Sequence, residues 1–174
     1  MTSTTTPRAT GYRELRDGQP FVAFTRTFPA AIDDVWAAVT ESDRLARWIG
    51  SWTGDPDEGH VMFRMLFEGD EHPAERMEIE ECRAPEHLAL RSISAGVDGE
   101  QVWEMRLDLA EADGVTTLVF AQSVPDPREA EGVGPGWDYY LDRMVAAETG
   151  GDPATIEFDD YYPALVEHYR GEFA

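Results

Sequence analysis

The stretch from Phe28 to Thr40, FPAAIDDVWAAVT, together with the Leu45-Ala46-Arg47-Trp48 that follows it, decides the fold of this chain. Its apolar residues recur at helical spacing and form one stripe, made of Ile32, Val35, Trp36 and Val39. Asp33 and Asp34 fall in the opening turn, where carboxylates favour the positive end of the helix dipole. The pattern predicts a strand that ends at the proline and a short amphipathic helix over 32–40.

The chain on both sides of this stretch shows the apolar and polar alternation that is typical of strands. A second helix is expected over 42–49, and strands are expected over 21–28, 60–68, 74–82, 87–94, 101–109 and 115–124. The gaps carry turn residues, and Asp98-Gly99 and Asp113-Gly114 are the clearest hairpin signals. Short gaps predict an antiparallel meander, because parallel strands need long crossover connections.

A long helix is expected after the last strand. Gly132-Val133-Gly134-Pro135-Gly136 reads as its lead-in, with Pro135 at the first helical position and Gly136-Trp137 at the start. A further helical stretch is expected over 160–169. These elements predict the α+β class, with an antiparallel sheet of about six or seven strands over the long C-terminal helix.

Three motifs carry a resemblance to a known family: Pro29-Ala30 with Val35-Trp36, Leu45-x-x-Trp48, and Gly136-Trp137-x-x-x-Leu141. Over residues 21–150 the chain resembles the START-like or Bet v 1-like (SRPBCC) superfamily, and within it the branch named after the activator of the Hsp90 ATPase. The resemblance implies a helix-grip fold, in which a curved sheet wraps around the C-terminal helix. It also implies a single START-like domain over 11–174, behind a flexible tail over 1–10.

The charge balance excludes some partners. The 174 residues include 14 basic side chains, all arginine, against 35 acidic ones, for a net charge of −21. Such a chain is repelled by phosphate backbones and by anionic membrane surfaces, so no nucleic-acid partner is expected. No apolar run approaches the roughly 20 residues that a membrane span needs, so no membrane insertion is expected.

The N-terminal residues and the cysteine content indicate a cytoplasmic protein. Residues 1–10 are rich in threonine and contain no apolar core, so they predict neither a signal peptide nor an anchor. The single cysteine, Cys82, excludes an internal disulfide and fits a reducing compartment. Cys82 is expected to be a buried or half-buried thiol.

Strand parity places one set of apolar side chains on the face toward the helix. This set contains Phe63, Met65, Met77, Leu90, Trp103, Met105 and Phe120. Trp137, Leu141 and Met144 project from the helix that covers them, and the resemblance implies that Trp48 and Trp52 lie near a cavity or its mouth. The set describes either a filled core or the wall of an apolar cavity for a small molecule.

A few polar side chains are expected on the same inward faces, namely Glu75, Gln122 and Tyr140. They could orient a guest by hydrogen bonds, or they could lie at the rim and satisfy one another. A desolvated Glu75 would have a raised pKa and could act as an acid or a base. The four histidines show no ligand spacing, and the glycine-rich lead-in follows no strand directly, so neither a metal nor another cofactor is expected.

Three functions remain open at this stage. The first is a cytoplasmic protein that binds a small hydrophobic or amphipathic molecule in the cavity. The second is an enzyme that resembles polyketide cyclases and uses Glu75, Gln122 or Tyr140, although no nucleophile or acid–base pair is visible. The third is a protein-interaction module like the co-chaperone domain that names the branch, with a basic patch on its protein partner.

We expect no measurable binding of DNA or RNA at physiological salt, because the charge of −21 opposes contact with phosphates. Fluorescence anisotropy with labelled duplex DNA and with single-stranded RNA checks this prediction. A micromolar complex that weakens as salt is added would contradict it.

Overall fold

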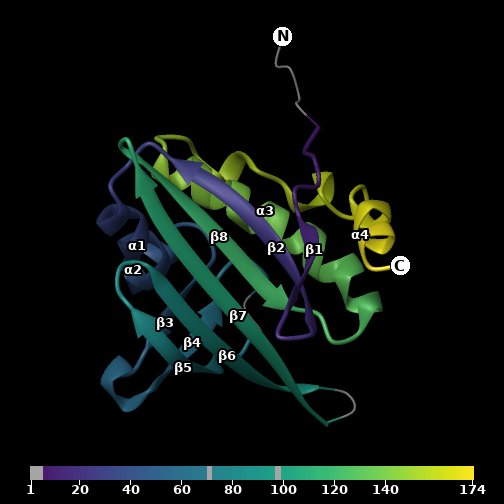
Figure 1. Ribbon diagram of the computed structural model, residues 1–174, viewed down its shortest axis with the longest axis horizontal. Helices are drawn as coiled ribbons and strands as arrows, with labels where there is room; N and C mark the ends of the chain where they lie inside the picture. Colours follow the sequence, from purple (N-terminus) through teal and green to yellow (C-terminus); the bar gives the residue numbers. More distant parts are fainter. Residues whose placement is uncertain (1–5, 70–71, 97–98) are drawn as a thin grey trace.

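A computed structural model describes residues 6–69, 72–96 and 99–174 (Figure 1). It is an α+β structure in which one antiparallel sheet packs against a long helix, as predicted. The helices are α1 Ile32–Thr40, α2 Ser42–Leu45, α3 Ala130–Glu148 and α4 Val166–Glu172. Short 3-10 turns are η1 Pro56–Glu58, η2 Pro127–Glu129, η3 Pro153–Thr155 and η4 Phe158–Asp160. None of the helices described is long and apolar enough to cross a membrane.

The sheet has eight strands in the order β1-β2-β8-β7-β6-β5-β4-β3. Their bounds are β1 Tyr12–Arg16, β2 Gln19–Phe28, β3 Gly50–Thr53, β4 His60–Met65, β5 Glu75–Arg83, β6 His87–Gly96, β7 Gly99–Ala112 and β8 Val115–Ser123. Figure 1 shows α3 across one face of the sheet, with α1 and α2 at one end of the molecule and α4 at the other.

Two strands, β1 and β3, go beyond the six strand segments identified in the sequence. A tight hairpin joins β1 to β2, and both of its turn residues have positive φ, 51° at Asp17 and 80° at Gly18. This Asp-Gly pair is a hairpin signal that lies in a polar stretch without clear alternation. The second predicted helix stops early, at Leu45; turns follow over 46–49, and β3 begins directly after them. A Cβ on Gly50 would lie 2.3 Å from the carbonyl oxygen of Arg64, so β3 approaches β4 at a point where only glycine fits.

The long helix begins earlier than predicted, and Pro135 lies inside it. The 3-10 turn η2 is capped by Asp126, whose side chain accepts a hydrogen bond from the Arg128 amide, and this turn runs directly into α3 at Ala130. The placement of the helix start at Gly136-Trp137 was therefore wrong. The last predicted helix also begins late, at Val166, because Pro163 disfavours helical backbone at the residue before it.

The buried carboxylate of Asp138 on α3 connects this helix to the N-terminal segment, to β2 and to α4. Asp138 has no exposed surface, and its oxygens accept hydrogen bonds from the Thr10 amide (3.2 Å), the Tyr169 hydroxyl and Arg26 Nη2 (3.3 Å). Burial raises the pKa of Asp138 above its usual range, and burial beside this carboxylate raises the pKa of Tyr169 as well. Both ends of the described chain are thus held against β2 and α3.

Tyr169 of α4 packs flat against the backbone of α3 at Gly134. A Cβ added to Gly134 would lie 2.3 Å from the ring carbon Cγ of Tyr169, which itself is fully buried. The contact with Tyr169 therefore requires glycine at position 134 but not at position 132, where an added Cβ would meet no atom within 4 Å.

We expect Gly134→Ala to destabilise the protein by about 1–3 kcal/mol, because the added methyl group displaces the Tyr169 ring from a full core. Gly132→Ala is the matched control on the same helix, and we expect it to be neutral or stabilising by about 0.5–1 kcal/mol. Urea unfolding followed by circular dichroism measures both. Equal stabilities of the two variants would show that α4 does not dock at Gly134.

Candidate functional site

A cavity of about 640 Å³ lies between the sheet, the α1–α2 segment and α3. This volume falls within the range of ~300–1,000 Å³ that is typical of small-molecule sites. The strands β4 to β8 contribute twelve apolar side chains to its wall, namely Val61, Phe63, Met65, Met77, Ile79, Leu88, Leu90, Trp103, Met105, Leu107, Leu118 and Phe120. Trp137 and Leu141 close it from the helix side, one helical turn apart on α3.

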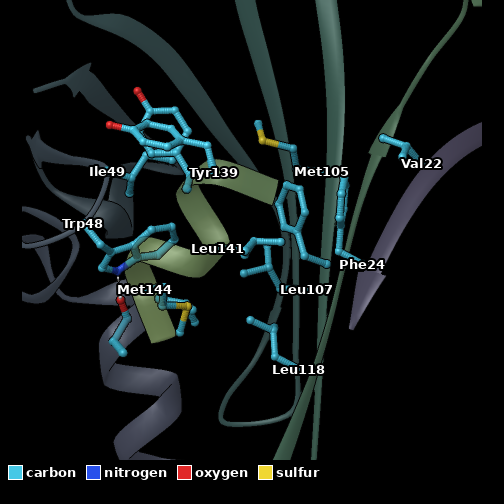
Figure 2. Packing of buried hydrophobic residues seen from close by; sticks show 14 of the residues in the cluster. Val22, Phe24, Trp48, Ile49, Met105, Leu107, Leu118, Tyr139, Leu141 and Met144 are labelled. Carbon is cyan, nitrogen blue, oxygen red and sulfur yellow. Dashed lines mark hydrogen bonds between the residues drawn. The ribbon is translucent and has the colours of Figure 1, made fainter. Parts of the chain in front are cut away.

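The lining includes the side chains predicted from strand parity, the polar Glu75 and Gln122, and the two tryptophans Trp48 and Trp52. Two predicted residues lie elsewhere. Met144 is fully buried in the core beyond the cavity, beside Leu141 and Trp48 (Figure 2). Tyr140 donates a hydrogen bond from its hydroxyl to Glu68 Oε1 (2.8 Å), and its burial raises its pKa above the usual range.

Trp48 and Trp52 link the cavity to the end of α1. The indole Nε1 of Trp48 donates to the carbonyl oxygen of Ala38 (3.1 Å), and that of Trp52 donates to Thr40 (2.8 Å). The last carbonyls of a helix have no partner within the helix, so these indoles supply the missing donors. Because the N–H groups are occupied in this way, the two rings offer the cavity mainly apolar surface.

Two hydrogen bonds connect polar groups of the wall. Trp137 Nε1 donates to Gln122 Oε1 over 2.6 Å, and the Trp137 ring centroid lies 4.1 Å from that of Phe120. Ser92 donates from its hydroxyl to Glu75 Oε2 over 3.2 Å. Glu75 is exposed at the entrance, so its carboxyl group is not desolvated as the sequence analysis considered.

Several lining residues were missed by parity. Trp36, Val39, Leu45 and Ile49 come from the opening stretch and the residues after it, where the apolar stripe itself was the available signal. Cys82 also borders the cavity but is exposed, so the expectation of a buried or half-buried thiol was wrong. A bulge between Ile79 and Glu81 shifts the register of β5 and turns Cys82 to the same face as Ile79, near the end of the strand.

The entrance carries exposed acidic side chains, which no sequence pattern indicated. Glu41 follows α1, Asp57 belongs to η1, and Glu75 begins β5. His72 is exposed among them. Across the described residues no three His, Cys, Asp or Glu side chains gather closely enough to hold a metal ion.

Known structures show the same fold. CalU16 from Micromonospora echinospora is 21% identical; its solution structure has a TM-score of 0.71, with 99% of this chain and 97% of that chain covered. EF2215 from Enterococcus faecalis, a conserved protein of unknown function, is 22% identical with a TM-score of 0.66, over 93% and 89% of the two chains. DynU16, from the dynemicin biosynthetic locus, is 24% identical with a TM-score of 0.61, over 76% and 49%.

Sequence comparison assigns the family. No curated protein matches this sequence significantly. The model of the family described as "Activator of Hsp90 ATPase homolog 1-like protein" matches residues 29–148, which is more than half of the chain and includes α1, the cavity strands and α3. The chain therefore belongs to the activator of Hsp90 ATPase homolog 1-like family, within the START-like superfamily.

Proposed function

We propose that this protein binds a small hydrophobic or amphipathic molecule in the cavity between the sheet and α3. The observation that carries the proposal is the cavity itself, about 640 Å³ of space walled mainly by apolar side chains. Transfer of apolar surface from water into such a wall is favourable by about 25 cal/mol per Å². A guest that fills the space would also make dispersion contacts with the lining atoms.

The composition of the wall supports binding of guests that vary in shape. Met65, Met77 and Met105 contribute flexible thioethers, which adapt to different surfaces at little energetic cost. The hydrogen bond from Trp137 to Gln122 and the one from Ser92 to Glu75 hold these polar side chains of the wall in place. We propose this function for a cytoplasmic protein, with residues 11–174 as the ligand-binding domain.

We expect N-phenylnaphthylamine, a neutral probe that fluoresces in apolar surroundings, to bind the purified protein in a saturable titration. Leu141→Trp places a larger ring into the cavity and should weaken probe binding at least tenfold, a loss of about 1.4 kcal/mol. Met62→Trp is the matched control, because Met62 neighbours Phe63 on β4 but is 37% exposed and does not line the cavity. Absence of binding to the wild type, or equal binding by both variants, would contradict the proposal.

We expect substitution by tryptophan to affect stability differently at two positions of α3 that lie three residues apart. Leu141→Trp should be close to neutral for stability, since the cavity can take the ring. Met144→Trp should cost about 1–3 kcal/mol, since Met144 is fully buried like Leu141 but does not line the cavity. Thermal melting of both variants measures the difference, and strong destabilisation of both would indicate a filled interior.

A further inference from the structure

Gln122 is a buried amide in an otherwise apolar part of the wall. It lies on β8 between Val22 of β2 and Met105 of β7, and only 7% of it is exposed. Apolar side chains surround it on the inner face, including Phe120 and Trp137. A buried polar group in such a place costs free energy unless each of its atoms finds a partner.

The orientation of the Gln122 amide is determined by Trp137. An indole N–H can only donate a hydrogen bond, so the Gln122 atom that Nε1 of Trp137 reaches at 2.6 Å must be the acceptor Oε1. The other end of the amide is then Nε2, which carries two N–H donors. Across residues 6–69, 72–96 and 99–174 no acceptor is hydrogen-bonded to this nitrogen.

Gln122 Nε2 is nevertheless not sealed inside the protein. Among the described residues, the only side-chain nitrogen or oxygen that is both fully enclosed and without a partner is Nε of Arg44. Gln122 Nε2 therefore keeps accessible surface, and the space that Gln122 lines is the cavity. The wall thus offers a pair of unused donors at a defined place.

The charges around the cavity limit which acceptor can use these donors. Among the residues that the structure describes, no arginine lines it, whereas the carboxylates of Glu41, Asp57 and Glu75 stand exposed at its entrance, together with His72. A guest with a carboxylate or sulfonate would pass these like charges and lose its hydration without a positive partner inside. An uncharged carbonyl oxygen accepts from an amide without either penalty.

We propose that the cavity selects apolar carbonyl compounds that carry no negative charge, and that Gln122 Nε2 donates a hydrogen bond to their carbonyl oxygen. This inference rests on the ligand-binding function proposed above and names the class of its ligand. Gln122 is the residue that distinguishes a carbonyl compound from a hydrocarbon of the same size. The acidic entrance distinguishes neutral or cationic guests from anionic ones.

The test compares three naphthalene probes. Prodan is a neutral naphthyl ketone, N-phenylnaphthylamine lacks a carbonyl, and anilinonaphthalene sulfonate adds a negative charge to the phenylnaphthylamine frame. We expect Gln122→Met to weaken Prodan binding about fivefold, the equivalent of one neutral hydrogen bond of ~1 kcal/mol, and to leave N-phenylnaphthylamine unchanged. Emission of bound Prodan should also move to shorter wavelength, since its carbonyl loses a donor.

A double variant protects the test against misfolding. Gln122→Met alone leaves the Trp137 N–H without its acceptor, so Gln122→Met combined with Trp137→Phe removes both partners and restores an apolar wall. This double variant should bind N-phenylnaphthylamine, and it should bind Prodan more weakly than the wild type does. Equal losses for both probes, or no loss for Prodan, would overturn the role of Gln122.

The proposed selection against negatively charged guests is tested separately. Wild-type protein should bind anilinonaphthalene sulfonate at least tenfold more weakly than N-phenylnaphthylamine at low salt. Replacement of Glu41, Asp57 and Glu75 by their amides should narrow that gap without a change for the neutral probe. Equal binding of both probes by the wild type would overturn the charge selection, whereas binding of none of the three probes would overturn the ligand-binding function itself.

Discussion

The contact of α3 with β2, the strand next to the edge strand β1, is the constraint on which the rest of the structure depends. Asp138 ties the helix to Arg26 of β2 and to Tyr169 of α4, and none of its own surface reaches solvent. Further along the helix, buried Arg143 donates from Nε to the carbonyl oxygen of Trp48 over 3.0 Å. A helix fixed at these points cannot settle onto β4 to β7, and the cavity is the space that remains.

The residues that determine the fold also build the candidate site. Trp48 and Trp52 supply donors to the last carbonyls of α1, and the same rings form part of the cavity wall. The apolar stripe of α1 also contributes to both the fold and the cavity, since Trp36 and Val39 line the cavity. In this chain the motif that is specific for the fold therefore also supplies part of the cavity wall, although it says little about the guest.

Much of the fold and of the cavity wall could be predicted from the sequence, because both depend on local periodicity. Alternation in the strands identified the inward faces on which Phe63, Met105 and Phe120 lie, and helical spacing identified Trp137 and Leu141. Turn residues indicated an antiparallel meander, which the sheet order confirms. Local patterns failed where a contact from elsewhere decides the outcome, as for β3, whose start at Gly50 depends on the backbone of β4.

The sequence by itself determined the fold class, the family resemblance and the inner faces, since spacing along one element decides which side chains share a side. Only the tertiary structure decided whether those faces enclose a filled core or a cavity, because that depends on how α3 is held at Asp138 and Arg143. It also decided that Glu75 lies at an exposed entrance while Gln122 turns two unused donors inward. Those arrangements depend on residues far apart in the chain, such as Gln122 with Trp137, which no local period connects.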